Sequence, residues 1–172
     1  MRENLCLFTD DFVPLILLGR IVAMPLDRNK SLQQLEGQDW GEPAYDSHLV
    51  TECHRSRRIP LSEFTAENLR IMIGQQIGLP HLIPLALELL RGDPFAAGDF
   101  YAGDLLATVL RADSRFWVAS PALRAEAAQI AQRALSLLPS LDETDRKAAQ
   151  DSLTDAHDIF QRAEYFAQHG RA

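Results

Sequence analysis

Hydrophobic positions recur at helical spacing along most of this chain and predict an all-α protein. Thr65 is a good N-cap residue, and the apolar positions that follow it are spaced i, i+3, i+4 and i+8, at Leu69, Met72, Ile73 and Ile77. This pattern predicts a helix that begins after Thr65 and is closed by Gly78. No segment shows the alternation of apolar and polar residues that is typical of a strand.

Caps, prolines and glycines set the bounds of the other expected helices. Ser31 and Gln34 have capping-box spacing, and Gly37 supplies a C-terminal stop. Ser120 and Pro121 are a cap followed by a first-turn proline. The resulting prediction is helices over residues 32–36, 48–58, 80–92, 104–111, 120–138 and from 142 onward, with a loop at 37–47 and a turn-rich acidic segment at 92–104.

Two features of these helices predict how they pack. The helix that starts at Pro80 is apolar around nearly its whole circumference, so we expect it to be central and buried on all sides. The last two helices carry apolar residues at alternating spacings of four and three, which predicts that they pair. The fold class is therefore all-α, an irregular helical bundle with a C-terminal antiparallel helical hairpin. The expected core aromatics are Phe100, Tyr101, Phe116 and Trp117.

The apolar segment 12–24 leaves two interpretations open. It contains Arg20 and is shorter than the roughly 20 apolar residues that span a bilayer, and the acidic residues before it are unlike a secretory signal. It is either a short buried helix or part of an extension upstream of a true start at Met24, and we favour the second. Residues 1–29 are then an N-terminal extension, and residues 30–172 form a single α-helical domain.

The charge balance restricts the class of partner. The chain has 17 basic and 24 acidic residues, a net charge of −7. Direct nucleic-acid binding is disfavoured, because it requires clustered positive charge, whereas a basic partner would be attracted. The two cysteines, Cys6 and Cys53, form no disulfide framework, so we expect a reducing compartment, the cytoplasm.

No residue pattern points to catalysis or to a metal. The neighbours Cys53 and His54 diverge along a helix and have no second ligand pair, which argues against both a zinc site and a Cys–His nucleophile. Asp99 and Asp104 could form an acid–base pair, but Asp104 lies where an N-cap is expected. The sequence therefore predicts a protein that is not an enzyme and has no cofactor.

The acidic loop is the most informative segment. Five acidic residues and no lysine or arginine lie between residues 31 and 54, and Trp40 lies among them. An exposed tryptophan among acids would make a binding hot spot, but Trp40 could instead anchor the loop to the core. The candidate binding residues are Asp39, Trp40, Glu42 and Asp46 in the loop, and Asp93 and Asp99 in the later turn-rich segment.

Four short motifs resemble bacterial contact-dependent growth inhibition (CDI) immunity proteins. They are D-W-G-E-P (39–43), L-R-I-M-I-G-Q (69–75), P-L-A-L-E (84–88) and G-D-F-Y-A-G-D-L-L (98–106). The resemblance extends over about residues 31–117, roughly half of the chain. The helices beyond it, and the first 29 residues, carry no comparable motif.

The resemblance implies a cytoplasmic, non-catalytic protein that binds a cognate toxin domain in a 1:1 complex. It further implies that the toxin is a nuclease, in many cases a tRNase, with a basic substrate site, and that the inhibitor itself contacts neither nucleic acid nor membrane. The alternative is a helical scaffold or adaptor that holds a partner peptide or protein in an apolar groove. Reversing the charges of Asp39, Glu42 and Asp46 together is expected to weaken toxin binding tenfold or more.

Overall fold

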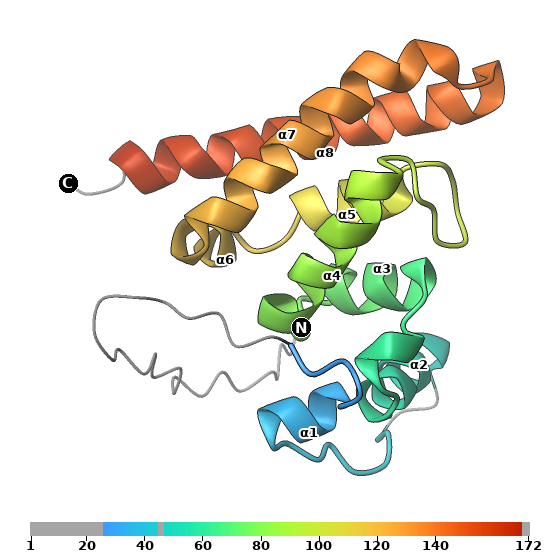
Figure 1. Ribbon diagram of the computed structural model, residues 1–172, viewed down its shortest axis with the longest axis vertical. Coiled ribbons are helices and arrows are strands. Elements are labelled where there is room, and N and C mark those ends of the chain that lie inside the picture. Colours follow the sequence, from blue (N-terminus) through green and yellow to red (C-terminus); the bar gives the residue numbers. More distant parts are fainter. Residues whose placement is uncertain (1–25, 45–46, 170–172) are drawn as a thin grey trace, which may run out of the picture.

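The computed structural model describes residues 26–44 and 47–169, and this part of the chain is all-α, as predicted (Figure 1). An isolated bridge between Ser31 and Pro60 is the nearest approach to β-structure within these residues. The expected extension, residues 1–29, lies mostly outside the described part, as do Asp46 and Cys6. The helices are α1 (Leu32–Glu36), α2 (His48–Arg58), α3 (Ala66–Gly74), α4 (Leu79–Gly92), α5 (Asp104–Leu110), α6 (Ser114–Ala119), α7 (Pro121–Leu137) and α8 (Glu143–His169), with short 3₁₀ turns η1 (Leu61–Glu63) and η2 (Leu138–Ser140).

Local chemistry explains where the N-terminal helices begin. The Ser31 hydroxyl accepts a hydrogen bond from the Gln34 N–H, and the Gln34 side chain accepts one from the Ser31 N–H. Thr65 and Asn68 form the same reciprocal capping box at the start of α3. Both boxes satisfy backbone donors that the first turn of a helix leaves without partners.

The helices form a stack from one end of the molecule to the other. In Figure 1, α1 and α2 lie at one end, α3, α4 and α5 occupy the middle, and α7 and α8 lie side by side at the other end. Helix α5 joins the two ends because it packs against α3, α4, α7 and α8. Six of its seven residues are buried, so this short helix is the centre of the core.

The prediction that the helix from Pro80 is buried on all sides is wrong. Leu82, Ile83 and Leu87 of α4 are fully buried, but Leu89 is 41% exposed. The stacked arrangement gives α4 partners on one side, in α3, α5 and α7, and leaves its other side open. The central position belongs to α5, whose seven residues are too few to reveal complete burial by their periodicity.

One helix bound and one additional helix also differ from the prediction. Helix α3 ends at Gly74, and Gly78 instead precedes α4 with a left-handed backbone, φ +64°. A Cβ at Gly78 would lie 2.9 Å from a Leu32 methyl carbon, so glycine meets both a conformational and a steric requirement there. Helix α6 was not predicted, because its six residues are fewer than two helical turns.

The predicted core aromatics separate into buried and exposed groups. Trp117 is buried, and Phe116 and Tyr101 are partly buried. Phe100, in contrast, is 70% exposed. Sequence reasoning could not distinguish them, because a loop gives no periodicity from which the direction of a side chain follows.

The two C-terminal helices are joined by η2 and contact each other, but α8 packs most extensively on α5. Ala149, Leu153, Ala156 and Phe160 form the buried face of α8. The C-terminal antiparallel helical hairpin stays a prediction. Across residues 26–44 and 47–169, no helix combines the length and apolar character needed to cross a membrane.

Candidate functional site

The acidic loop holds Trp40 in a half-exposed position against α2. Its indole is 41% exposed and lies with its ring centroid 4.1 Å from the guanidinium carbon of Arg57. The His54 ring meets it edge-on, with 5.5 Å between ring centroids. The Trp40 ring is therefore anchored by these contacts and also partly available to solvent, while its role as a binding hot spot stays a prediction.

The buried side chain of Arg57 holds this loop in place. It is only 2% exposed, and its Nη1 lies 2.5 Å from Glu36 Oε2 at the end of α1. Its Nη2 donates to the Gln38 carbonyl oxygen at 3.2 Å. Its Nε has no hydrogen-bond partner among the residues described. A buried guanidinium is stable only when its charge is compensated, and here Glu36 and the Gln38 carbonyl oxygen compensate it. The Arg57 side chain thereby connects the end of α1, the loop backbone and the Trp40 ring.

The loop is less negative than its sequence indicates, because arginines of α2 neutralise part of it. Glu42 is 84% exposed and pairs with Arg58 at 3.1 Å. Asp39 forms no such pair within the described chain, and its Oδ1 accepts the Gly41 N–H at 2.9 Å. Asp39 and Glu42 lie on either side of Trp40 in the sequence, and Asp39 carries the less compensated charge.

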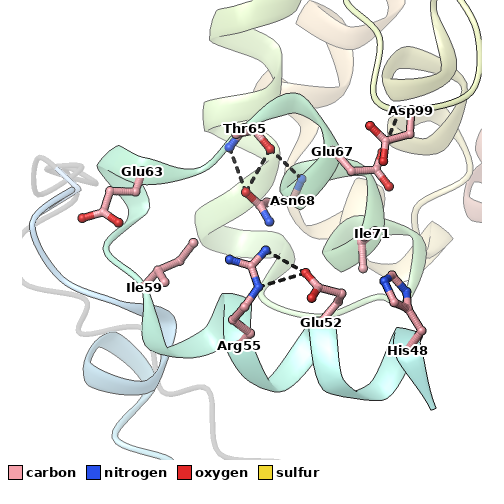
Figure 2. Close-up of a pocket in the computed structure, with 10 residues that line it drawn as sticks. All are labelled: His48, Glu52, Arg55, Ile59, Glu63, Thr65, Glu67, Asn68, Ile71 and Asp99. Atoms are coloured by element: carbon pink, nitrogen blue, oxygen red, sulfur yellow. Dashed lines mark hydrogen bonds and ion pairs between the residues drawn. The ribbon is translucent and has the colours of Figure 1, made fainter.

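A second surface is a cleft of about 460 Å³ between α2 and α3 (Figure 2). Helix α2 contributes side chains spaced three and four residues apart, which places them on one face. The residues that line the cleft are His48, Glu52, Arg55, Ile59, Glu63, Thr65, Glu67, Asn68, Ile71 and Asp99. Four carboxylates and one arginine make this cleft acidic.

Two of the cleft carboxylates are fixed by arginines. Arg55 donates to Glu52, at 2.7 Å for the shorter contact, and this bond lowers the pKa of the Glu52 carboxyl. Arg70 hydrogen-bonds Glu67 and, with the Asp99 N–H, lowers the pKa of that carboxyl. Both carboxylates therefore stay ionised at neutral pH, and their arginine partners compensate much of their charge.

The predicted residues of the turn-rich segment have different environments. Asp99 lies at the edge of the cleft, with its carboxyl group exposed. Asp93 follows the end of α4, and its Oδ1 accepts the Phe95 N–H at 2.9 Å, so it stabilises a turn. It does not line the cleft.

The expectation that Asp104 is an N-cap needs correction. The N-cap of α5 is Gly103, which has φ +87°. Asp104 is 2% exposed, and its carboxylate accepts N–H groups of Gly98 and Phe100 in the preceding loop, at 2.7 and 3.2 Å. Both carboxylate oxygens are occupied by the loop, so the residue has a structural role in holding it.

The structure does not unite all predicted binding residues in one site. Asp39, Trp40 and Glu42 lie on the side of α2 that carries His54, Arg57 and Arg58. Asp99 lies at the opposite side, where His48, Glu52 and Arg55 face α3. The described residues thus form two acidic surfaces on either side of α2, with Asp93 outside both.

The region around Cys53 offers neither ligand geometry nor an activated thiol. Cys53 is buried, and desolvation raises its thiol pKa, which disfavours the reactive thiolate. The neighbouring His54 instead contacts the loop, with Nδ1 3.1 Å from the Gly41 carbonyl oxygen. In the part of the chain that is described, no group of three or more His, Cys, Asp or Glu side chains could hold a metal ion.

Comparison with protein families supplies the decisive observation. The family described as CDI immunity proteins matches residues 34–127, more than half of the 172-residue chain. The chain belongs to the CDI immunity protein family. No curated protein and no solved structure matches it. The region matched in this CDI immunity protein contains both acidic surfaces and ends within α7, before α8 begins.

Sequence reasoning missed several residues of these surfaces. Glu52 and Arg55 were visible only as part of a charge run, and Glu63 and Glu67 were not singled out. Phe100 was assigned to the core although it is exposed beside Asp99. The helical spacing of His48, Glu52, Arg55 and Ile59 is the signal that could have located the cleft in this CDI immunity protein.

Glu67 provides a pH-dependent test of the second surface. Because its folded-state pKa lies below the ordinary value of 4.5, its contacts stabilise the protein above that pH and are lost as pH falls through the lower folded value. Glu67→Gln is expected to reduce the loss of unfolding free energy as the pH falls below the ordinary value of 4.5. Denaturant melts at several pH values measure this difference. An unchanged slope in the variant would show that Glu67 titrates normally in the folded protein.

Proposed function

We propose that this CDI immunity protein binds and neutralises the toxin domain of its cognate CDI system. The proposed toxin is a nuclease, with tRNA as the favoured substrate class, whose basic substrate site is attracted to the acidic inhibitor. The proposed complex has 1:1 stoichiometry and forms in the cytoplasm. In this proposal, the immunity protein acts by binding rather than by catalysis and contacts neither nucleic acid nor membrane.

The family match over residues 34–127 carries this proposal. That interval encloses Asp39, Trp40, Glu42, Asp93 and Asp99, all the candidate binding residues that the structure describes. The net charge of −7 supports a basic partner, because opposite charge speeds association.

The acidic loop, residues 37–47, holds Trp40 in a preorganised position for contact with a partner. Arg57 holds one face of the indole, so little conformational freedom is lost when a partner covers the rest. Asp39 and Glu42 place negative charge beside the ring. Buried tryptophans at the centre of an interface commonly contribute much of the binding energy, with charged groups around them.

Titration of the purified toxin domain tests the function and this loop together. The wild-type protein is expected to bind at 1:1 stoichiometry and to stop cleavage of tRNA. Asp39→Lys combined with Glu42→Lys is expected to weaken binding at least tenfold, about 1.4 kcal/mol, mainly through slower association. A triple variant that also carries Asp46→Lys reverses the charge of all three acidic candidates in the loop.

A matched control separates a local contact from overall charge. Asp151→Lys with Asp158→Lys makes the same change in net charge at exposed positions of α8, and should leave affinity nearly unchanged. If the two double variants weakened toxin binding equally, the effect would come from the overall electrostatic field of the protein and not from a local contact. Wild-type protein that neither binds nor inhibits the toxin would contradict the proposed function.

One observation supports the adaptor alternative. A groove of about 410 Å³ lies on the open side of α4 and is lined by apolar residues such as Phe64, Leu85 and Leu89, together with the ion pair of Arg28 and Glu88. An adaptor that holds a peptide there would show affinity insensitive to salt, whereas the toxin complex should weaken as salt increases. The salt dependence of the affinity for the partner that is actually bound, peptide or toxin domain, therefore distinguishes these functions.

A further inference from the structure

The loop of residues 97–103, the Phe100 loop, holds an aromatic ring out in solvent. At 70%, Phe100 has the largest exposed fraction among the large hydrophobic residues described. The guanidinium carbon of Arg70 lies 4.2 Å from its ring centroid and covers part of the ring. A single exposed apolar side chain is common on protein surfaces, so the significance of Phe100 depends on how its loop is held.

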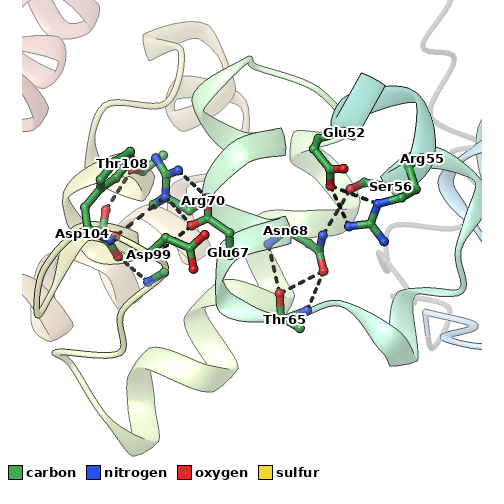
Figure 3. A network of polar contacts seen from close by, with 12 residues as sticks. Glu52, Arg55, Ser56, Thr65, Glu67, Asn68, Arg70, Asp99, Asp104 and Thr108 are labelled. Carbon is green, nitrogen blue, oxygen red and sulfur yellow. Dashed lines mark hydrogen bonds and ion pairs between the residues drawn. The ribbon is translucent and has the colours of Figure 1, made fainter. Parts of the chain in front are cut away.

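A buried carboxylate fixes the backbone of this loop. Asp104 is 2% exposed and accepts N–H groups on both sides of Asp99, from Gly98 and from Phe100. Arg70 Nε lies 3.7 Å from Asp104 Oδ2 and compensates its charge. Figure 3 shows Arg70 between Asp104 and Glu67, so the loop is tied to α3 as well as to α5.

Glu67 completes the attachment to α3. Its Oε2 accepts the Asp99 N–H at 3.0 Å and a bond from Arg70 Nε at 2.7 Å, while Oε1 accepts Arg70 Nη2 at 2.6 Å. A Cβ at Gly98 would lie 2.2 Å from Glu67 Oε2, so a larger residue would displace this carboxylate. Three successive residues, 98 to 100, therefore have their N–H groups bound by fixed carboxylates.

The far end of the loop is attached independently. The Tyr101 hydroxyl lies 2.6 Å from Ser152 Oγ on α8, and the Gly103 N–H donates to the Phe95 carbonyl oxygen at 3.0 Å. None of these contacts involves the Phe100 side chain. The loop can keep its conformation without that ring, whereas the ring depends on the loop for its exposed position.

The surroundings of the ring define the chemistry of a partner. Asp99 is next to Phe100 and lines the acidic cleft together with Glu52, Glu63 and Glu67. Among the described residues, the carboxylate of Glu63 forms no ion pair, and that of Asp99 interacts with Arg70 only through the longer-range attraction that helps to raise the pKa of the guanidinium. A partner that covers Phe100 must therefore offer an apolar pocket bordered by arginine or lysine side chains.

We propose that the Phe100 loop and the adjoining α2–α3 cleft form a preorganised contact surface for the toxin, in which Phe100 enters an apolar pocket and basic side chains of the toxin enter the cleft. This inference rests on the proposed function and adds a contact on the opposite side of α2 from Trp40. A loop whose backbone is already fixed loses little entropy on binding, so the ring can act as an anchor.

Binding kinetics of the purified toxin domain with variants of the full chain test the surface. Phe100→Ala is expected to raise Kd about thirtyfold or more, chiefly through faster dissociation, with unchanged thermal stability. Glu63→Lys with Asp99→Lys is expected to slow association and to reduce its salt dependence. Gly98→Ala keeps the ring but disturbs Glu67, and is expected to weaken binding with Phe100 still present.

Val118→Ala is the control, because Val118 is also hydrophobic and is 57% exposed, but belongs to α6. It should bind like the wild type. If wild-type protein inhibits the toxin and Phe100→Ala and the charge variant both bind normally, the proposed surface is wrong and the proposed function stands. If wild-type protein does not bind the toxin, both proposals fall. Weakening by Val118→Ala as much as by Phe100→Ala would also overturn the assignment.

Discussion

Phe160→Ala is expected to lower the free energy of unfolding by about 3–5 kcal/mol, the range for large aromatic truncations in a packed core. Phe160 is 1% exposed and meets Trp117 of α6 edge-on, with 5.2 Å between ring centroids. The guanidinium carbon of Arg124 on α7 lies 4.9 Å from its ring centroid. One ring therefore joins α6, α7 and α8, and its removal leaves a cavity where three helices meet.

Urea denaturation followed by circular dichroism measures this loss, and Ile159→Ala is the matched control. Ile159 precedes Phe160 on α8 but is 44% exposed, so its truncation is expected to change stability by less than about 1 kcal/mol. The melting temperature of Phe160→Ala should fall by roughly 10 °C. Equal effects of the two substitutions would contradict the described packing of α8.

Glu36→Gln is expected to lower the free energy of unfolding by about 3 kcal/mol, because it leaves the buried Arg57 without a carboxylate. Glu36 is itself only 23% exposed, so water compensates the lost charge poorly. The loss should extend to function, since Arg57 also holds the Gln38 carbonyl oxygen and the Trp40 ring. We therefore expect weaker toxin binding by Glu36→Gln even under conditions in which the variant is folded.

Glu42→Gln provides the comparison, because it breaks an ion pair of the same loop at an exposed position. Its carboxylate is 84% exposed, and such pairs contribute at most about 1 kcal/mol. Denaturant melts of the two variants under the same conditions measure the difference. A loss in Glu36→Gln no larger than that in Glu42→Gln would mean that Arg57 is adequately solvated without its partner.

Helices with strong local signals could be predicted from the sequence, and those defined by tertiary packing could not. The capping boxes at Ser31 and Thr65 involve residues three positions apart, so the chain contains the whole motif. Helix α6 and the central position of α5 depend on neighbours distant in sequence. The apolar circumference of α4 was misleading because partners cover only one of its sides.

In the candidate site, too, features of the local sequence could be predicted, whereas contacts between residues distant in the sequence could not. The charge run and Trp40 drew attention to the acidic loop as a candidate site, which stays a prediction. Its partial neutralisation by Arg58 and its support by Arg57 could not be predicted, because they arise from contacts across 16 to 21 positions. Asp104 was correctly assigned a structural role, with the wrong N–H partners. Phe100 was misplaced because its exposure results from hydrogen bonds of Asp104 and Glu67 to the loop backbone.

The most direct measurement is survival of cells in which the cognate toxin domain is induced with or without this protein. We expect the cells to die without this protein, and to survive with it while a 1:1 complex of toxin domain and immunity protein can be recovered. Loss of protection in a chain that combines Phe100→Ala with Asp39→Lys and Glu42→Lys, at unchanged soluble expression, would support the two proposed surfaces. Death of cells that express the wild-type protein in soluble form would contradict the proposed neutralisation of this toxin.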